Sequence, residues 1–479
     1  MAASAAALRP LDSVPSLGKA FLFTARSRLC AALMQKGSEH PRMFRMHLGP
    51  KTACVVTHPE IARSVLTRPK DFIKREIPRN PASALQTLLH CNKDGTYSIG
   101  FANGKDWAVL REPVAPVFEK QALQNLLPKF NDSSEKLLET WRGADEVDAK
   151  QDMSRFALDV LGSAVLGQSF GAIDGSFTDT YAHYQYIMAE QSNPIYMSFP
   201  FMERLPTSRN RRLRQSVHHL HGVLQGAIDA RVQLRREQQA AGTLSEEPQD
   251  MLDMLLGPGV DVPKDGVLPK EGSLVPLLYV FFLAGHDTTA VSLAWQMYFL
   301  AKYPEVQQKA REEVQGILGG RKDPTVEDLE KVPYLSAVIN EGLRIRPPLF
   351  NLYTRQAAHD TELDGVFIPG GTHISLHIAA INKHPEVWGE AEDFNPERFL
   401  QEKQPRVFHN LPFGAGPRRC IGDKFSLMEQ KSLLMKLLTQ YKVLPHEDTV
   451  DGEENFTSSM LGMLFLQPEE MKVRLQPVQ

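Results

Sequence analysis

The sequence predicts a mainly α-helical fold with small β-sheets. Apolar residues follow the helical period almost throughout residues 121–239, with breaks at 167–176 and 193–206, and the longest predicted helix runs from 273 to 302. Short patterns bounded by Gly and Pro predict strands at 43–48, 53–57, 349–355 and 366–376.

By length, the 479 residues could form two to four domains or one large domain. No low-complexity linker or internal repeat divides them, so we predict an N-terminal segment, 1–40, and a single domain, 41–479. The net charge of −3 gives no reason to expect a nucleic-acid partner. The cysteines lie far apart, which indicates neither a disulfide framework nor a zinc site and favours a reducing compartment. They are Cys30, Cys54, Cys91 and Cys420.

The N-terminal segment has no clear anchor. No stretch reaches the roughly 18 apolar residues that span a bilayer, and no basic residue precedes an apolar run as in a signal peptide. Residues 13–38 contain serines and basic residues but no acid until Glu39. They are interpreted as an exposed amphipathic first helix or a mitochondrial presequence, and a truncated gene model is a third reading. Localisation stays open between the cytoplasmic side of the endoplasmic reticulum membrane and the cytoplasm, with mitochondria disfavoured.

A loop at residues 413–422 holds Cys420 directly before an apolar helical pattern. Gly414 and Gly416 allow the loop to curl around the sulfur, and Gly422 allows a flat ligand to lie close to the helix start. Loop N–H groups, the helix dipole and two neighbouring arginines would favour a thiolate. A lone cysteine is usually a small buried apolar residue. In this loop, however, its thiolate suits the proximal ligand of a haem iron, with the opposite face left open.

The order F-x-x-G-x-R-x-C-x-G resembles the cytochrome P-450 superfamily of haem-thiolate monooxygenases, in its eukaryotic microsomal-like type but without an evident membrane anchor. The resemblance extends from about residue 41 to the C-terminus. It implies the cytochrome P-450 fold, with a long central helix over the haem and the cysteine loop on the proximal side. It also implies heme b with the Cys420 thiolate as axial iron ligand, held by the loop residues Phe413, Gly414, Arg418 and Gly422.

Three arginine or tryptophan positions are expected to hold the haem propionates. Trp107 and Arg111 are four residues apart on a predicted helix and so project from one face. Alone, such a pair is usually a surface contact. The resemblance implies that both bind one propionate and that Arg355 binds the other; arginine suits an anionic carboxylate.

The predicted helix 273–302 has a polar interruption, A-G-H-D-T-T, at its middle. Buried polar groups are costly without a purpose. The Thr288 hydroxyl is expected to bond the Ala284 carbonyl, and Gly285 to let a ligand approach. The run resembles the oxygen-activating helix of the family, which implies that Thr288 and Asp287 are catalytic and that Ala284 contacts haem.

Glu341 and Arg344 form an E-x-x-R pair on a predicted helix, which ends at two prolines, Pro347 and Pro348. A P-E-R-F motif that contains Arg398 follows downstream. Pairs three residues apart are mostly exposed and contribute little. The resemblance implies instead that these three residues form a buried structural network under the haem.

The implied function is insertion of one atom of dioxygen into a small apolar organic substrate. The chain has no G-x-G-x-x-G fingerprint and no room for a flavin domain, so electrons would come from a separate reductase. That partner would be of the NADPH-cytochrome P-450 reductase or ferredoxin type and would dock near Lys424 and Lys431.

Two alternatives keep the haem but change the function: a peroxide isomerase or dehydratase that needs no external electrons, and a haem-binding sensor or carrier. The intact Asp287-Thr288 pair argues against the first.

Residues 193–206 also allow two interpretations. They form an apolar lid before a solvated basic helix face, or a substrate entrance in peripheral contact with a membrane.

Overall fold

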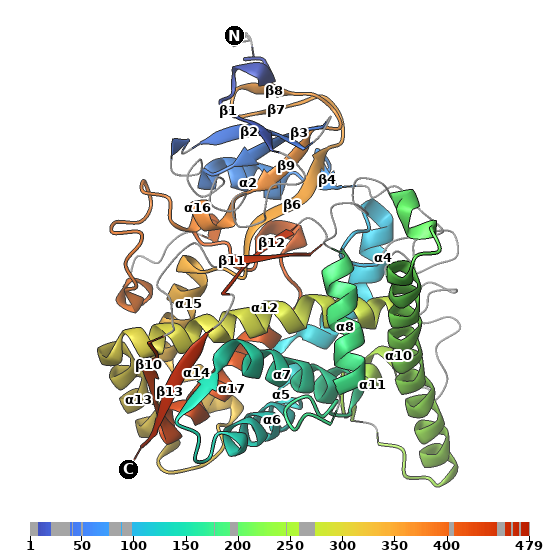
Figure 1. The fold of residues 1–479 in the computed structure, drawn as a ribbon, viewed down its shortest axis with the longest axis vertical. Coiled ribbons are helices and arrows are strands. Elements are labelled where there is room, and N and C mark those ends of the chain that lie inside the picture. The colour runs from blue at the N-terminus through green and yellow to red at the C-terminus, as the bar shows by residue number, and fades with distance from the viewer. Residues whose placement is uncertain are drawn as a thin grey trace.

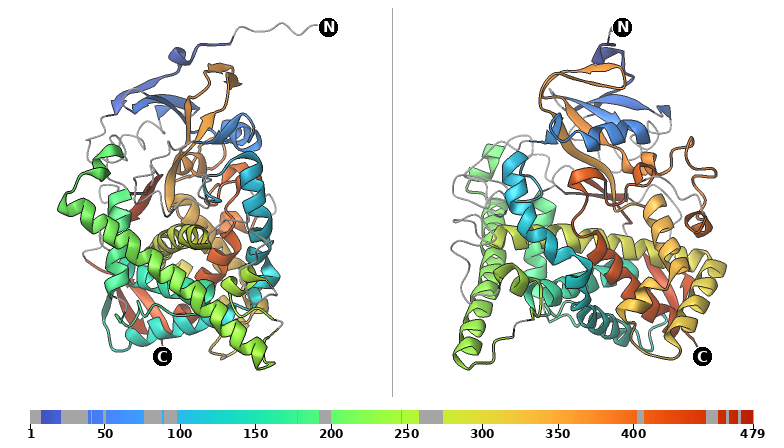
Figure 2. Two further views of the ribbon diagram at one scale, coloured as in Figure 1. Left: turned by 90° about the vertical axis from the view of Figure 1, so that its right-hand side faces the viewer. Right: turned by 180° about the vertical axis from the view of Figure 1, so that it is seen from behind.

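The computed structural model describes residues 8–20, 39–40, 42–48, 51–75, 88, 98–176, 178–191, 200–245, 247–257, 274–401, 407–447, 456–460, 463–468 and 471–478. A β-rich lobe forms one end of the molecule, and helices form most of the rest (Figure 1). The side and back views show the same division (Figure 2). The fold is therefore mainly α with small sheets, as predicted.

The described helices follow the predicted pattern closely. They are α2 (Pro59–Thr67), α4 (Gly104–Val114), α5 (Lys120–Gln124), α6 (Leu127–Thr140), α7 (Ala149–Leu161), α8 (Thr178–Gln191), α10 (Ser208–Ala240), α11 (Met251–Leu256), α12 (Leu274–Lys302), α13 (Pro304–Leu318), α14 (Val326–Glu330), α15 (Pro333–Ile345), α16 (Ile378–Asn382) and α17 (Asp423–Gln440). Proline at the first position starts α13 and α15, where its missing N–H costs nothing.

The largest sheet has eight strands in the order β1-β2-β3-β9-β6-β12-β11, with β4 paired to β6. A second sheet has the order β10-β13-β5, and β7 pairs with β8. The strands are β1 (Ser16–Ala20), β2 (Met43–Leu48), β3 (Lys51–Val56), β4 (Phe72–Lys74), β5 (Glu146–Asp148), β6 (Leu349–Ala357), β7 (Thr361–Leu363), β8 (Val366–Ile368), β9 (His373–Leu376), β10 (Tyr441–Pro445), β11 (Phe456–Met460), β12 (Met463–Pro468) and β13 (Lys472–Pro477).

Helix α12 runs through the helical body (Figure 1) and contacts α7, α10, α13, α15 and α17. It is long and apolar enough to cross a membrane, but 78% of its most apolar window is buried inside the fold. A helix that is apolar all round belongs in a core. The prediction of a buried core helix over 273–302 is confirmed.

Two sequence expectations differ from the structure. Within the segment read as a first helix, Ser16–Ala20 form β1, which pairs in parallel with β2, while residues 21–38 lie outside the described part. Pairing with an existing sheet edge overrides local helical pattern here. Strand β5 was also not predicted, because its three residues are extended only through pairing with β13, far along the chain.

The lid prediction falls partly outside the described residues, which resume at Pro200. From there the chain forms a 3-10 turn, Pro200–Arg204, in which Phe201 is 59% exposed. Thr207 then caps α10 by accepting a hydrogen bond from the Asn210 N–H. The apolar turn before the basic helix is thus present where the sequence predicts it.

Glu429 lies inside α17 with no exposed surface. Neither of its carboxylate oxygens has a hydrogen-bond partner among the described residues. Burial raises the pKa of this carboxyl well above its ordinary value. The folded chain therefore holds a proton on Glu429 that the unfolded chain releases as the pH rises.

We expect Glu429→Gln to be more stable than wild type near neutral pH. The folded-state pKa is raised, so wild-type stability is greatest below the unfolded pKa of about 4.3 and falls as pH increases, by at most about 1.4 kcal/mol per pH unit. Urea unfolding of both proteins between pH 5 and 8 would measure this slope, which the variant should lose. Glu327→Gln, at a glutamate whose side chain is 84% exposed, is the control and should keep the wild-type slope. Equal slopes in Glu429→Gln and wild type would contradict a protonated Glu429.

Candidate functional site

The loop around Cys420 is closed by backbone hydrogen bonds. The Cys420 N–H donates to the Phe413 carbonyl at 3.0 Å. Gly414 and Gly416 have φ of +66° and +73°. A Cβ on Gly416 would lie 2.5 Å from the Leu66 carbonyl oxygen at the end of α2. Glycine is thus required at 416 both by its conformation and by close approach of the β-rich lobe.

The electrostatic environment of Cys420 differs from the sequence expectation. Burial raises the pKa of its thiol, although the Gly422 N–H, Arg111 and Arg419 act in the opposite direction. The loop alone therefore does not favour a thiolate, since desolvation outweighs the donors. A coordinating metal ion would reverse this balance, because it deprotonates a bound thiol outright. Protein atoms surround Cys420 closely enough to desolvate its thiol, yet the residue keeps accessible surface, so a ligand can reach it.

The polar interruption of α12 opens one side of an otherwise buried helix. Ala284 is exposed, and Asp287 and Thr288 are partly exposed. The Thr288 hydroxyl donates to the Ala284 carbonyl at 2.5 Å, as predicted. Gly285, by contrast, faces α7: a Cβ there would lie 3.0 Å from Leu161. This glycine serves helix packing rather than approach of a ligand.

The polar side of α12 meets the helix that follows the cysteine loop. The hydroxyls of Thr289 and Ser426 lie 2.9 Å apart, and Ser292 donates to the Gln430 side chain at 2.8 Å. Ser426 lies in the first turn of α17, directly after the loop. These contacts bring the Thr288 region and the cysteine loop into one neighbourhood.

A cluster of cations lies beside the loop. Burial lowers the pKa of Arg355 to about 10 and that of Arg418 to about 9, and the charges of Arg355 and Arg111 lower the pKa of Arg418 further. Burial also lowers the pKa of Arg111. Among the described residues, none of these arginines has a carboxylate within ion-pair distance, and Arg355 Nε and Arg418 Nη2 are buried without a partner. Such a cluster is stabilised only by an anionic ligand.

Trp107 organises this cluster. The Arg418 guanidinium lies 4.6 Å from the Trp107 ring centroid and that of Arg111 lies 6.0 Å from it. Arg111 also donates to the Arg419 carbonyl at 3.4 Å. The structure thus brings together Trp107, Arg111, Arg355 and Arg418, all predicted to hold haem.

Lys74 joins the cluster and was missed by sequence reasoning. It pairs across the sheet with Arg355, since β4 and β6 are antiparallel neighbours. Burial, together with Arg355 and Arg418, lowers the pKa of Lys74 well below its ordinary value. The only signal in the sequence was a basic pair, Lys74-Arg75, at the end of a short apolar stretch.

Gly422 caps the start of α17. A Cβ at this position would meet only Phe118, at 3.8 Å, which is an ordinary contact. The protein itself does not require glycine there. Its predicted role beside a flat ligand therefore stays a prediction.

Glu341, Arg344 and Arg398 form the buried network that was expected. Arg344 bonds both Glu341 oxygens at 2.7 and 2.9 Å, and both residues are fully buried. Arg398 Nε reaches Glu341 at 2.9 Å from the turn Pro396–Phe399. Both guanidinium groups also lie over the Trp388 ring, at 4.9 and 5.6 Å from its centroid.

The two lysines expected at a reductase-docking surface differ in setting. Lys424 is exposed at the start of α17 and forms an ion pair with Glu119. Lys431 is half-buried and donates to the Leu329 carbonyl at 2.7 Å, and burial lowers its pKa. Lys424 is therefore the better candidate for an intermolecular contact.

Comparison with known proteins identifies the family of this chain. A sequence model of the family "Cytochrome P450" matches residues 8–475, so the chain belongs to the cytochrome P450 family of haem-thiolate monooxygenases. Cytokinin hydroxylase of Arabidopsis thaliana is 33% identical over 71% of this chain and 65% of its own length.

Other relatives match over more of their length. Echinocystic acid 23-monooxygenase of Saponaria officinalis is 28% identical over 88% of this chain and 79% of its own length. Cyclooctat-9-en-7-ol 5-monooxygenase of Streptomyces melanosporofaciens is 28% identical over 90% and 88%. These relatives are named for oxygen insertion at different kinds of molecule, so they agree on the reaction and leave the substrate undetermined.

We expect Glu341→Ala to lose about 3–5 kcal/mol of stability, because it leaves two buried arginines without their carboxylate. Little haem-loaded protein should be recovered, as measured by the ratio of Soret to protein absorbance after expression. The matched control is Glu60→Ala, which breaks the exposed Glu60–Arg63 bridge at the same spacing and should cost no more than about 1 kcal/mol. Wild-type yield and stability in Glu341→Ala would show that the network is dispensable.

Proposed function

We propose that Cys420 is the axial thiolate ligand of heme b and that Trp107, Arg111, Arg355 and Arg418 hold its propionates. The observation that carries this proposal is the buried cluster of Arg111, Arg355 and Arg418 beside the cysteine loop, for which the described residues supply no carboxylate within ion-pair distance. Two carboxylates would satisfy the orphaned guanidinium atoms, and arginine pairs with carboxylates through two parallel hydrogen bonds. Lys74 belongs to the same anion-binding group.

The chain would use this site as a monooxygenase acting on a small apolar organic substrate. When bound, the haem supplies the oxygen and electron chemistry of the reaction. The exposed Ala284 follows a run of apolar side chains in α12, Leu277 to Leu283, which supports an apolar rather than a charged substrate. No observation favours the peroxide-rearranging or sensor alternatives.

Electrons would come from a separate reductase of the NADPH-cytochrome P-450 reductase or ferredoxin type, docking around Lys424. That residue lies four positions after Cys420 and is 49% exposed. Exposed Phe201 and Leu205 support a peripheral membrane contact at the other side of the fold.

Asp287 would receive protons through a chain of closely spaced side chains. His286 Nδ1 lies 3.1 Å from Asp287 Oδ1 but forms no hydrogen bond among the described residues, so this last link would need a small rotation of either side chain. His286 Nε2 lies 3.0 Å from the Ser154 hydroxyl and 2.9 Å from the Ser154 carbonyl. The Ser154 hydroxyl is 2.8 Å from the hydroxyl of Tyr181, which is partly exposed. An imidazole exchanges protons at both nitrogens, so this route leads from the surface of α8 to Asp287.

Thr288 would stand at the inner end of that route. Its hydroxyl donates to the Ala284 carbonyl, so its oxygen lone pairs can accept a hydrogen bond from a water or from protonated Asp287 and hold that group in place for proton delivery. His286 is 1% exposed and is therefore shielded from bulk solvent. The sequence suggested Asp287 and Thr288 but gave no sign of Ser154 or Tyr181, which come from other helices.

The ligand assignment predicts a spectrum. The ferrous carbonyl complex of the purified protein should show the strongly red-shifted Soret band of thiolate-ligated haem. Cys420→His should lose this band even where haem is retained, because imidazole is a weaker electron donor than thiolate. Cys54→Ser is the control, since Cys54 lies buried in β3 and should leave the band in place. An unchanged spectrum in Cys420→His would refute the assignment.

The proton route predicts uncoupling of oxygen consumption from product formation. Thr288→Ala should keep haem and the carbonyl spectrum, yet release several times more hydrogen peroxide per oxidised product, and Thr288→Ser should lie between it and wild type. Ser154→Ala, which interrupts the route before His286, should shift the ratio in the same direction but less, because a water can take the place of the hydroxyl. The measurement is the ratio of peroxide to product at matched haem content. A wild-type ratio in Thr288→Ala would remove Thr288 from the reaction.

A further inference from the structure

Helices α8 and α10 lie side by side and bring three ligand-type side chains together. Asp179 and His183 are four residues apart on α8, so they project from one face. His219 reaches them from α10. The candidate ligand atoms of the three residues lie within 4.8 Å of one another, and His183 Nε2 is 3.7 Å from Asp179 Oδ1. In a tetrahedral zinc site each nitrogen or oxygen ligand lies about 2.0–2.1 Å from the metal, so two ligand atoms lie somewhat closer to each other than the 3.7 Å seen here. Side-chain rotations would complete the site.

The second nitrogen of each ring is already held by a hydroxyl group. His183 Nδ1 lies 2.8 Å from Ser216 Oγ, and His219 Nε2 lies 2.7 Å from Thr180 Oγ1. A hydroxyl accepts a hydrogen bond as readily as it donates one, so both nitrogens can carry the ring proton. His183 Nε2 and His219 Nδ1 then present lone pairs. Hydrogen bonds from the other ring nitrogen to such acceptors orient the imidazoles of metal sites.

Packing further restricts the two rings. Their centroids are 4.4 Å apart with an interplanar angle of 32°. Ser216 is fully buried, which fixes its hydroxyl against α8. The Asp179 carboxylate, in contrast, is 82% exposed and the His183 side chain is 26% exposed, so an ion from solvent can reach the group.

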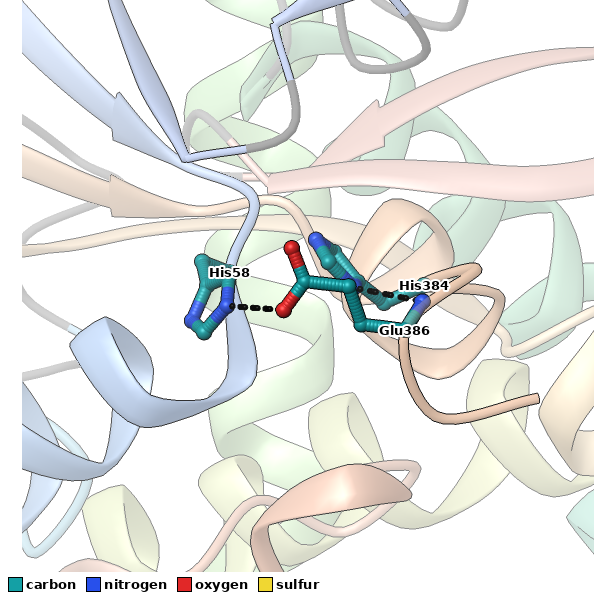
Figure 3. A group of neighbouring side chains, drawn as sticks. All are labelled: His58, His384 and Glu386. Carbon is teal, nitrogen blue, oxygen red and sulfur yellow. Dashed lines mark hydrogen bonds and ion pairs between the residues drawn. The ribbon is translucent and has the colours of Figure 1, made fainter.

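A second group of two histidines and one carboxylate has backbone N–H groups, rather than hydroxyls, bonded to Nδ1 of each ring. His58, His384 and Glu386 also lie close together (Figure 3). There, however, His58 Nδ1 accepts the Glu60 N–H at 3.2 Å and His384 Nδ1 accepts the Glu386 N–H at 3.3 Å. The ring proton of each neutral imidazole must then sit on Nε2, and His58 Nε2 donates to Glu386 at 3.2 Å. This group is a hydrogen-bonded histidine–carboxylate cluster in which both nitrogens of His58 and Nδ1 of His384 already form hydrogen bonds.

We propose that Asp179, His183 and His219 bind one zinc ion, with water as the remaining ligand, and that the ion ties α8 to α10. Two imidazoles and one carboxylate form a ligand set typical of zinc, whereas calcium and magnesium prefer oxygen ligands alone. The site is separate from the haem site, and the proposal does not depend on the proposed function.

The position of the site gives the ion an effect on the rest of the fold. Tyr184 of α8 is buried, and its ring centroid lies 5.2 Å from that of His286 in α12. The Ser154 hydroxyl forms hydrogen bonds with both Tyr181 and His286, and so links Tyr181 to the same histidine. An ion that fixes α8 against α10 would therefore hold these two tyrosines against the polar interruption of α12.

The experiment titrates zinc chloride into the haem-loaded full chain, free of tag histidines and pretreated with a chelator. Isothermal titration calorimetry should detect one equivalent per chain. His183→Gln and His219→Gln should abolish this binding, and Asp179→Asn should weaken it. Ser216→Ala, which removes only the hydroxyl behind His183, should weaken it by about 10- to 100-fold. The matched control is His218→Gln: His218 is exposed on α10 next to a proposed ligand and should leave binding unchanged.

Thermal unfolding provides a second measurement, which distinguishes a substitution that removes a zinc ligand from one that destabilises the fold. Zinc should raise the melting temperature of wild type and His218→Gln but not of His183→Gln or His219→Gln, while all four melt alike in chelator. Absence of saturable zinc binding by wild type would overturn the proposal. It would equally be overturned if binding survived in both His183→Gln and His219→Gln, or if only His58→Gln abolished it.

Discussion

One buried carboxylate holds the approach to the cysteine loop in place. Glu341 of α15 accepts hydrogen bonds from Arg344, Arg398 and the Asn395 N–H, and so fixes the turn Pro396–Phe399 that leads toward the loop. A charge without solvent contact is tolerable only when several donors surround it. Because Arg344 belongs to α15 while Asn395 and Arg398 belong to the turn, the network fixes the position of the turn against the helix as well as adding stability.

The proposed haem site combines burial with side chains that would have to be charged. Burial around Cys420 disfavours its thiolate, and burial around Arg355 and Arg418 disfavours their charge, so the protein alone satisfies neither side. A bound metal and two carboxylates would compensate both at once. The polar interruption of α12 is a similar exception, since Asp287 and Thr288 lie partly exposed in an otherwise apolar helix, as the proposed catalytic role would require.

Sequence reasoning predicted the parts of the site that are carried by short motifs. The curled loop at Cys420 and the Thr288–Ala284 hydrogen bond follow from residues close together in one loop or helix, whereas the Glu341 network, which includes Arg398 from a separate turn, was expected from the family resemblance. It missed Lys74, β5 and the Ser154–Tyr181 contact, because each depends on pairing between segments far apart in the chain. Gly285 was misinterpreted for the same reason: its neighbour, Leu161, belongs to another helix.

The cation cluster has a consequence for how the cell handles this chain. Arg355 and Arg111 disfavour the charge of Arg418, so a newly made chain would carry an electrostatic penalty that binding of an anionic prosthetic group would remove. By mass action, whatever binds the folded form alone stabilises it. The population that escapes proteolysis would then follow the supply of haem, and protein abundance would report on porphyrin availability without any dedicated regulator.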